Sequence, residues 1–206
     1  MTEDLLKKYP LISDQVSKEE LRVVLRNLER VLQRGTEGDL VEFGCYIGTT
    51  SLFIRRILDG YGQSPERSFH VYDSFEGLPP KADADQNAAG IDFKAGELLV
   101  SKKQFLHEFQ RAKLQTPIVH KGWFDQLPSQ AVPQKIAFAF LDGDFYESIS
   151  ASLRLVWPRM QEGGIVLIHD YKRETLPGVE RAITNFFQKY HYRNLQGEQN
   201  IAIIQV

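Results

Sequence analysis

The chain has 206 residues, of which 42% are apolar and 25% are charged, a composition typical of one globular domain with a sizeable core. Its net charge of −2 excludes the basic excess of a nucleic-acid-binding surface, and no apolar run reaches the ~20 residues that cross a membrane. A single cysteine, Cys45, and an N-terminus without a long apolar core favour a cytoplasmic protein without internal disulfides.

The first strong pattern in the chain is an amphipathic helix over residues 17–34. Ser17 and Glu20 have the spacing of a capping box, in which each side chain accepts from the other residue's backbone N–H. Six apolar residues then share one face of the helix: Leu21, Val24, Leu25, Leu28, Val31 and Leu32. We expect residues 1–38 to form an N-terminal helical segment that caps the main domain and offers an interface for a homo-oligomer.

The main domain, residues 39–206, alternates short apolar runs with amphipathic stretches. The apolar runs predict strands over residues 39–44, 68–73, 117–122, 135–142 and 164–170. The amphipathic stretches predict helices over residues 49–59, 101–113, 146–157 and 178–190. Residues 190–195 and 201–206 flank Gly197 and are expected to form a terminal antiparallel pair. The alternation indicates an α/β fold, with a mostly parallel sheet covered by helices on both faces.

Ligands bind open α/β sheets beyond the carboxyl ends of the strands, so the residues after each strand are the candidates for a site. The first strand runs into EFGCYIGTT, residues 42–50, where Gly44 and Gly48 let the backbone turn sharply beside a ligand. The threonine and serine residues that follow are expected to cap the next helix. The loop matches neither the dinucleotide fingerprint nor the G-K-[ST] phosphate motif, and a glycine turn without a ligand is the alternative.

Two later strand ends carry candidates for binding a nucleoside. Asp73 ends the second strand, and its carboxylate can accept from both hydroxyls of a ribose. The alternative for Asp73 is that it merely starts a turn. Trp123 follows the third strand, and its indole suits stacking on an aromatic base, with core or rim packing as the alternative.

Acidic residues follow the next two strands. Asp142 and Asp144 come after the fourth strand, and His169 and Asp170 come after the fifth. If these strands are neighbours, their carboxylates meet at one point and repel one another unless a cation joins them. Mg²⁺ takes one or two carboxylates, which makes a divalent cation our first interpretation. The alternative is a hydrogen-bonded His169 beside an Asp170 that caps a turn.

Together and in this order, the motifs resemble S-adenosylmethionine-dependent methyltransferases of the macrocin O-methyltransferase family. The matching segments run from about residue 39 to 187 and read VEFGCYIGTTS, DSFEGLPP, GWF, LDGDFYES and GG-x-x-x-x-HDY. The resemblance implies a Rossmann-like class I methyltransferase fold, with a seven-stranded sheet and a reversed C-terminal strand. It also implies that residues 39–206 are the methyltransferase domain and that sugar hydroxyls are the acceptors.

The resemblance assigns roles by matching position. The metal site that it implies consists of Asp142, His169 and Asp170. Characterised sugar-modifying members carry two acids at the last two positions, and an imidazole suits Mn²⁺, Fe²⁺ or Zn²⁺ better than Mg²⁺. The residues implied for binding S-adenosylmethionine are Glu42, Gly44, Cys45, Tyr46, Ile47, Gly48, Thr49, Asp73, Ser74, Phe75, Gly77, Ser101, Gly122, Trp123 and Asp142.

We therefore expect an O-methyltransferase that moves a methyl group from S-adenosylmethionine to a hydroxyl of a sugar or another small hydroxylated metabolite. A divalent cation, Mg²⁺ or Mn²⁺, would assist it, and Asp142, Asp144 and His169 are the candidate catalytic groups. Two other functions fit the same residues. One is a metal-dependent hydrolase, and the other is an inactive module that only binds S-adenosylmethionine. No nucleic-acid or membrane partner is expected.

Overall fold

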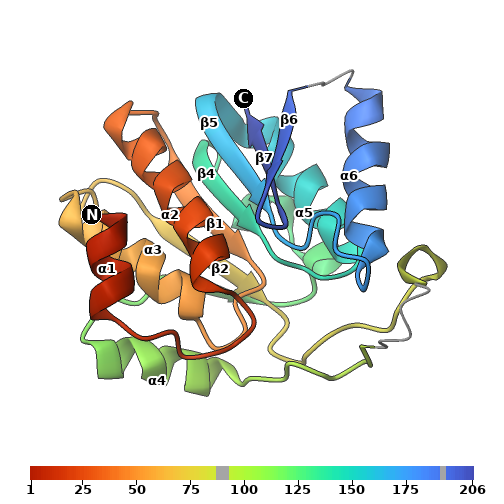
Figure 1. Ribbon diagram of the computed structural model, residues 1–206, viewed down its shortest axis with the longest axis horizontal. Coiled ribbons are helices and arrows are strands. Elements are labelled where there is room, and N and C mark those ends of the chain that lie inside the picture. Colours follow the sequence, from red (N-terminus) through yellow and green to blue (C-terminus); the bar gives the residue numbers. More distant parts are fainter. Residues whose placement is uncertain (87–92, 191–193) are drawn as a thin grey trace.

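A seven-stranded sheet runs through the centre of the computed structural model, which describes residues 1–86, 93–190 and 194–206 (Figure 1). The order of the strands across the sheet is β3-β2-β1-β4-β5-β7-β6. Strands β1 to β5 pair in parallel, and β7 runs antiparallel to β5 and β6, which confirms the predicted fold class. The strands are β1 (Asp39–Phe43), β2 (Phe69–Asp73), β3 (Ile118–Lys121), β4 (Ile136–Leu141), β5 (Met160–Ile168), β6 (Leu195–Glu198) and β7 (Ile201–Gln205).

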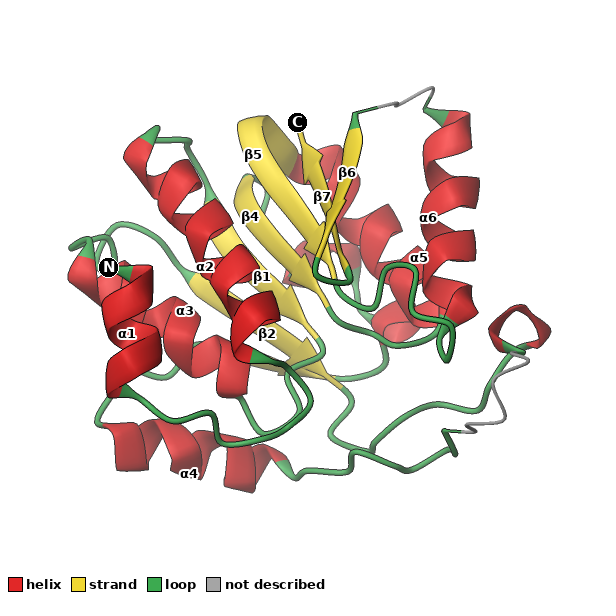
Figure 2. Cartoon of the chain, viewed as in Figure 1, coloured by secondary structure: helices red, strands yellow, loops and turns green. Residues whose placement is uncertain are grey.

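Helices cover both faces of the sheet, as predicted (Figure 2). One face carries α1 (Thr2–Lys8), α2 (Lys18–Gln33), α3 (Thr49–Gly60) and α4 (Lys102–Ala112), and the other carries α5 (Tyr146–Val156) and α6 (Pro177–Lys189). The described residues also contain short 3₁₀ helices, namely η1 (Asp83–Asp85), η2 (Phe124–Gln126), η3 (Ser129–Ala131) and η4 (Trp157–Arg159). Within this described part of the chain, no helix is long and apolar enough to cross a bilayer.

Strand β4 shows why the sheet needs both layers of helices. Its sequence, IAFAFL, is buried throughout. Phe138 and Phe140 belong to the apolar cluster on the α2 side, whereas Ala139 and Leu141 belong to the cluster on the α5 side. A parallel strand that is buried on both faces carries apolar side chains at successive positions, which is why this strand reads as one continuous apolar run.

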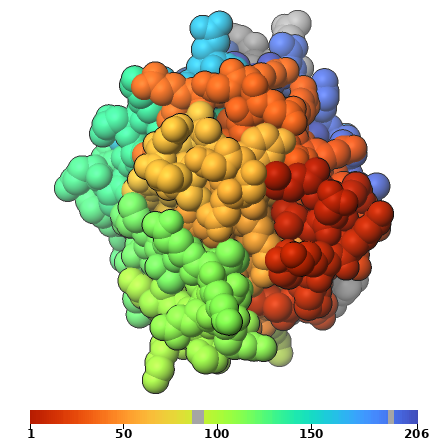
Figure 3. Space-filling view, turned by 90° about the vertical axis from the view of Figure 1, so that its left-hand side faces the viewer, coloured from red at the N-terminus to blue at the C-terminus, as the bar shows by residue number. Residues whose placement is uncertain are grey.

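The N-terminal segment belongs to the layer of helices that covers one face of the sheet. The Ser17 side chain accepts from the backbone N–H of Glu20, and the Glu20 carboxylate accepts from that of Ser17, so the predicted capping box is present. The apolar face of α2 joins the same buried cluster as the sheet. Figure 3 shows the N-terminal segment in red beside the gold surface of α3. A role for this segment in forming an oligomer stays a prediction.

The structure differs from the sequence-based expectation in α1, which was not predicted, and at the start of β5. The strand begins at Met160, so Gly163 and Gly164, which read as a boundary, lie inside it. Gly163 has a φ of +78°, and the pairing of β4 with β5 shifts register here, as at a β-bulge.

The predicted terminal hairpin forms, but its turn lies elsewhere. Gln199 and Asn200, with φ values of +48° and +56°, close the turn between β6 and β7. Two successive residues with positive φ suit the right-handed twist of the strands that they join. Gly197 instead lies within β6 opposite Ala202. Of the expected strand 190–195, Tyr190 ends α6, and residues 191–193 lie outside the described residues.

Candidate active site

A cavity of about 620 Å³ opens at the carboxyl ends of β1, β2, β4 and β5, a size typical of small-molecule sites. Residues from separate segments of the chain surround this one space. The predicted site residues that line the cavity are Glu42, Gly44, Cys45, Tyr46, Thr49, Asp73, Ser74, Gly77, Trp123, Asp142, Asp144, His169 and Asp170.

Some predicted residues lie behind this wall. The lining does not include Ile47, Gly48, Phe75, Ser101 or Gly122. Phe75 packs on the ring of Phe105, with ring centroids 6.0 Å apart. Ser101 caps α4, where its hydroxyl accepts from the backbone N–H of Gln104 at 3.2 Å. A direct contact between these residues and a cofactor stays a prediction.

The loop after β1 passes very close to the end of β4. Gly44 has a φ of +86°, and a Cβ at this position would lie 1.9 Å from the backbone oxygen of Asp142. Only glycine fits this conformation and this close approach. The glycine loop and the acidic strand end therefore share one wall of the cavity.

The expectation that a threonine or serine caps α3 is wrong. The N-cap is Gly48, which has no side chain to accept from the first backbone N–H groups. The Ser51 hydroxyl instead donates to the buried Glu42 carboxylate at 2.5 Å, and Thr49 shares a hydrogen bond of 2.7 Å with Ser13. Because the first N–H groups of a helix carry partial positive charge, this end of α3 suits a ligand carboxylate.

Asp73 organises the glycine loop from the end of β2. Its Oδ2 accepts from the backbone N–H groups of Cys45 at 2.9 Å and Tyr46 at 3.3 Å. Its Oδ1 accepts from the backbone N–H of Phe75 at 2.7 Å. Asp73 thus fixes the shape of the loop while it faces the cavity, so a ligand that binds its carboxylate also contacts the group that holds the loop.

Glu42 is a buried acid at the end of β1, 1% exposed. Burial raises the pKa of Glu42 to about 8 against the opposing hydrogen bond from Ser51, and the charges of Asp142 and Asp73 add to the rise. Glu42 is therefore largely protonated near neutral pH. A cationic group placed beside it would favour the ionised form and release this proton.

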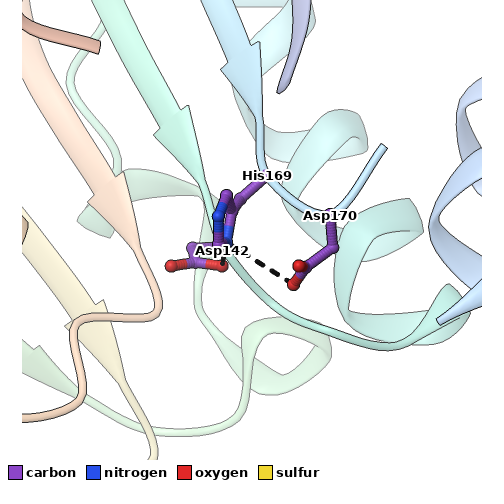
Figure 4. A group of neighbouring side chains, drawn as sticks. All are labelled: Asp142, His169 and Asp170. Atoms are coloured by element: carbon purple, nitrogen blue, oxygen red, sulfur yellow. Dashed lines mark hydrogen bonds and ion pairs between the residues drawn. The ribbon is translucent and has the colours of Figure 1, made fainter. Parts of the chain in front are cut away.

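Asp142, His169 and Asp170 meet where β4 and β5 end (Figure 4). Nδ1 of His169 lies 2.8 Å from Oδ1 of Asp142 and 3.5 Å from Oδ2 of Asp170. One ligand atom from each residue lies within 4.8 Å of the others. The Asp142 side chain is 25% exposed, whereas those of His169 and Asp170 are 3% and 4% exposed, so the cluster is buried on one side and open at Asp142.

The electrostatics of this cluster fit a cation. Burial lowers the pKa of His169, but the charges of Asp142 and Asp170 outweigh it and raise that pKa well above its usual value. Burial, with Asp142 and Asp170, also raises the pKa of Asp144. The cluster therefore retains protons that a bound cation would replace. A nitrogen with two carboxylates is a donor set that suits Mn²⁺, Fe²⁺ or Zn²⁺.

Several residues of the cavity wall were not among those predicted from the sequence. Ser13, Gln15 and Val16 reach it from the segment between α1 and α2, and no short motif marks them. Glu147 of α5 also lines the cavity. Arg173 lies there as well and pairs with Asp170 at 2.9 Å. The two residues are three positions apart in the sequence, which is a signal that could have identified this ion pair.

A family model described as macrocin-O-methyltransferase (TylF) matches residues 9–198, which is most of the chain. The chain belongs to the macrocin O-methyltransferase family. Its matched region includes the glycine loop, Asp73 and the acids at the ends of β4 and β5.

Two curated relatives from streptomycetes resemble this family member. The 8-demethyl-8-(2,3-dimethoxy-alpha-L-rhamnosyl)-tetracenomycin-C 4'-O-methyltransferase of Streptomyces olivaceus is 39% identical over 151 residues, 70% of this chain and 57% of that protein. The demethyldecarbamoylnovobiocin O-methyltransferase of Streptomyces niveus is 31% identical over 150 residues, 70% of this chain and 56% of that protein. The chain thus spans just over half the length of these relatives.

Among solved structures, the O-methyltransferase NovP superposes with a TM-score of 0.78 at 24% identity. The superposition covers 92% of this chain and 80% of NovP. This likeness shows that the macrocin O-methyltransferase family member has the class I methyltransferase fold that its sequence motifs implied.

Proposed function

We propose that the protein is an S-adenosylmethionine-dependent O-methyltransferase, assisted by a divalent cation, that acts on a hydroxyl of a sugar or another small hydroxylated metabolite. The observation that carries this proposal is the single cavity that brings together the glycine loop, Asp73 and the acids after β4 and β5. Family membership supports the cofactor. The relatives' names, with a rhamnosyl tetracenomycin and a novobiocin derivative, support a sugar-like acceptor.

When bound, S-adenosylmethionine supplies a methyl group made electrophilic by the sulfonium, and a divalent cation would lower the pKa of an acceptor hydroxyl. In our proposal, Gly44 and Tyr46 lie along the methionine part, Asp73 accepts from the ribose hydroxyls, and Trp123 lies against the adenine. Most of the catalytic effect comes from holding donor and acceptor in line, which lowers the activation free energy by about 7–11 kcal/mol.

The proton of the acceptor hydroxyl needs a base inside the cavity. Asp144 lines the cavity two residues after Asp142, and its backbone adopts a φ of +60°. We assign the proton transfer to Asp144, because Asp142, His169 and Asp170 together would hold the cation. Mg²⁺ and Mn²⁺ are the ions to test first.

We also propose a cytoplasmic location. The sequence contains one cysteine, Cys45, and its buried thiol is free. A protein without disulfides fits a reducing compartment. Burial, with the charges of Asp73 and Glu42, raises the pKa of the Cys45 thiol, which keeps it in the unreactive protonated form.

Calorimetric titration of the purified protein with S-adenosylmethionine tests the first step. Incubation with the cofactor and a set of rhamnosides and phenols, followed by mass spectrometry, tests methyl transfer with and without EDTA. No cofactor binding would reject the proposal. Cofactor binding without turnover of any acceptor would favour the inactive module. Hydrolysis without methyl transfer would favour the hydrolase. Methyl transfer that EDTA does not inhibit would show that the reaction needs no divalent cation.

A further inference from the structure

Glu20 is a buried carboxylate in the first turn of α2, 4% exposed. Its Oε2 accepts from the backbone N–H of Ser17 at 2.8 Å and from the Ser17 hydroxyl at 2.7 Å, which completes the capping box. The cap uses only this one oxygen. The other, Oε1, lies 3.4 Å from Nε2 of His169 and 3.2 Å from Nη2 of Arg173.

The two nitrogens of His169 therefore have carboxylates on opposite sides. Nδ1 faces Asp142 and Asp170, whose oxygens lie 2.8 Å and 3.5 Å away. Nε2 is buried and makes no hydrogen bond of good geometry with any described residue, and its ion-pair contact is Glu20. The imidazole thus lies between the acid cluster in the cavity and the first turn of α2.

We propose that Glu20 is a positioning residue for the metal cluster, holding His169 in the tautomer that carries its proton on Nε2 and turns the lone pair of Nδ1 toward Asp142 and Asp170. This inference rests on the proposed function, since it requires a divalent cation at those three residues. Histidines that bind metals usually donate their other ring N–H to a carboxylate, which fixes the ring and makes the ligand nitrogen more basic.

The charges around Glu20 support this role. Burial disfavours the ionised form of Glu20, but the nearby His169 imidazole and the hydrogen bonds from Ser17 outweigh it and hold its pKa well below the usual range. An ionised carboxylate can only accept, so it selects the tautomer that donates. Arg173 bridges Glu20 and Asp170, with its Nε 2.9 Å from Oδ1 of Asp170, and places one positive charge between the two carboxylates.

The experiment is a titration of the full chain with Co²⁺ or Mn²⁺. Calorimetry measures binding of either ion, and visible absorption also measures binding of Co²⁺. In Glu20→Gln, the amide oxygen can keep the capping box, because glutamine serves at this position. The amide NH₂ group then faces Nε2 and forces the ring proton onto Nδ1. We expect metal affinity to fall about 10- to 100-fold, the usual effect of losing such a partner.

Ser17→Ala is the matched control. It removes the hydroxyl that caps α2 and leaves Oε1 of Glu20 against His169. We expect this variant to melt at a lower temperature and to bind the metal as the wild type does. If Ser17→Ala weakened metal binding as much as Glu20→Gln, the effect would belong to the helix cap, and the inference would be overturned.

The outcomes separate this inference from the proposed function. Failure of the wild type to bind any divalent cation would overturn both the cation in the proposed function and the role of Glu20. Equal affinities in wild type and Glu20→Gln would overturn the role of Glu20 alone. A ¹⁵N NMR spectrum of His169 in the Zn²⁺-loaded wild type tests the tautomer: a proton on Nε2 supports the inference, and a proton on Nδ1 overturns it.

Discussion

The carboxylate of Asp85 occupies the space that a side chain at Gly178 would need, since a Cβ there would lie 1.7 Å from Oδ1 of Asp85. Asp85 belongs to η1, is 1% exposed, and accepts from the backbone N–H of Tyr146 at 2.7 Å. Gly178 lies in the first turn of α6, and Tyr146 starts α5. One loop carboxylate thus lies at the N-termini of two helices, where helix dipoles favour a negative charge.

This contact predicts strong coupling between the two positions. Gly178→Ala should destabilise the wild-type chain by about 1–3 kcal/mol through overpacking. In an Asp85→Ala background the clash with the carboxylate is gone and the backbone nitrogen of Tyr146, at 3.0 Å, is the tight contact that remains. The same change should then cost clearly less, because alanine suits a helix better than glycine by about 1 kcal/mol. Urea unfolding of the four proteins measures the coupling. Additive effects would show that the two residues do not compete for the same space.

Glu42 should make stability depend on pH. Its pKa is about 8 in the folded chain and 4.5 ordinarily, so the folded state binds more protons between these values. The free energy of unfolding must then fall as pH rises across this window, by up to about 1.4 kcal/mol per pH unit. Urea unfolding of wild type and Glu42→Gln across the window isolates the contribution. Parallel pH profiles of the two proteins would contradict the raised pKa.

Asp73→Asn should weaken cofactor binding and loosen the glycine loop together. An amide has one acceptor atom in place of two, so either the hydrogen bonds from Cys45 and Tyr46 or the one from Phe75 are lost. Such bonds are worth about 1.5–3 kcal/mol, which corresponds to roughly 10-fold or more in affinity for S-adenosylmethionine. Glu76→Gln, at an exposed neighbour paired with Lys121, is the matched control and should bind the cofactor normally. Unchanged affinity in Asp73→Asn would argue against a ribose contact.

Asp144→Asn should lower kcat by about 10²- to 10⁴-fold, the usual contribution of a general base. Asparagine tolerates the left-handed backbone at this position, where φ is +60°, so the fold should persist. Calorimetry should show unchanged binding of S-adenosylmethionine. Full turnover in this variant would show that a group other than Asp144 takes the proton.

The sequence allowed the fold and the location of the cavity to be predicted because both depend on local patterns. The alternation of strands and helices fixed the parallel sheet, and the carboxyl ends of its strands necessarily share one edge. That geometry brought Asp73, Asp142 and His169 to one cavity, although they lie far apart along the chain.

Features that depend on packing between distant segments were not predictable in this way. The capping-box pattern explained Glu20 as a local cap and gave no reason to look for His169, which it reaches only because α2 packs on the sheet. The hairpin turn was misplaced because Gly197 is the stronger turn signal, yet Gln199 and Asn200 adopt the positive φ values. Local propensity is a weak guide where register with β7 decides the turn.

The hairpin of β6 and β7 places its second strand inside the sheet, since β7 lies between β5 and β6. The backbone oxygen of Asn200 accepts from the N–H of Tyr171 at 2.8 Å, and the Asn200 amide lies 3.4 Å from Glu20. Residues near positions 20 and 200, far apart along the sequence, therefore meet beside His169. A chain in which the β6–β7 hairpin has not yet docked on β5 has an incomplete sheet, so the contacts around His169 are complete only after this hairpin has folded.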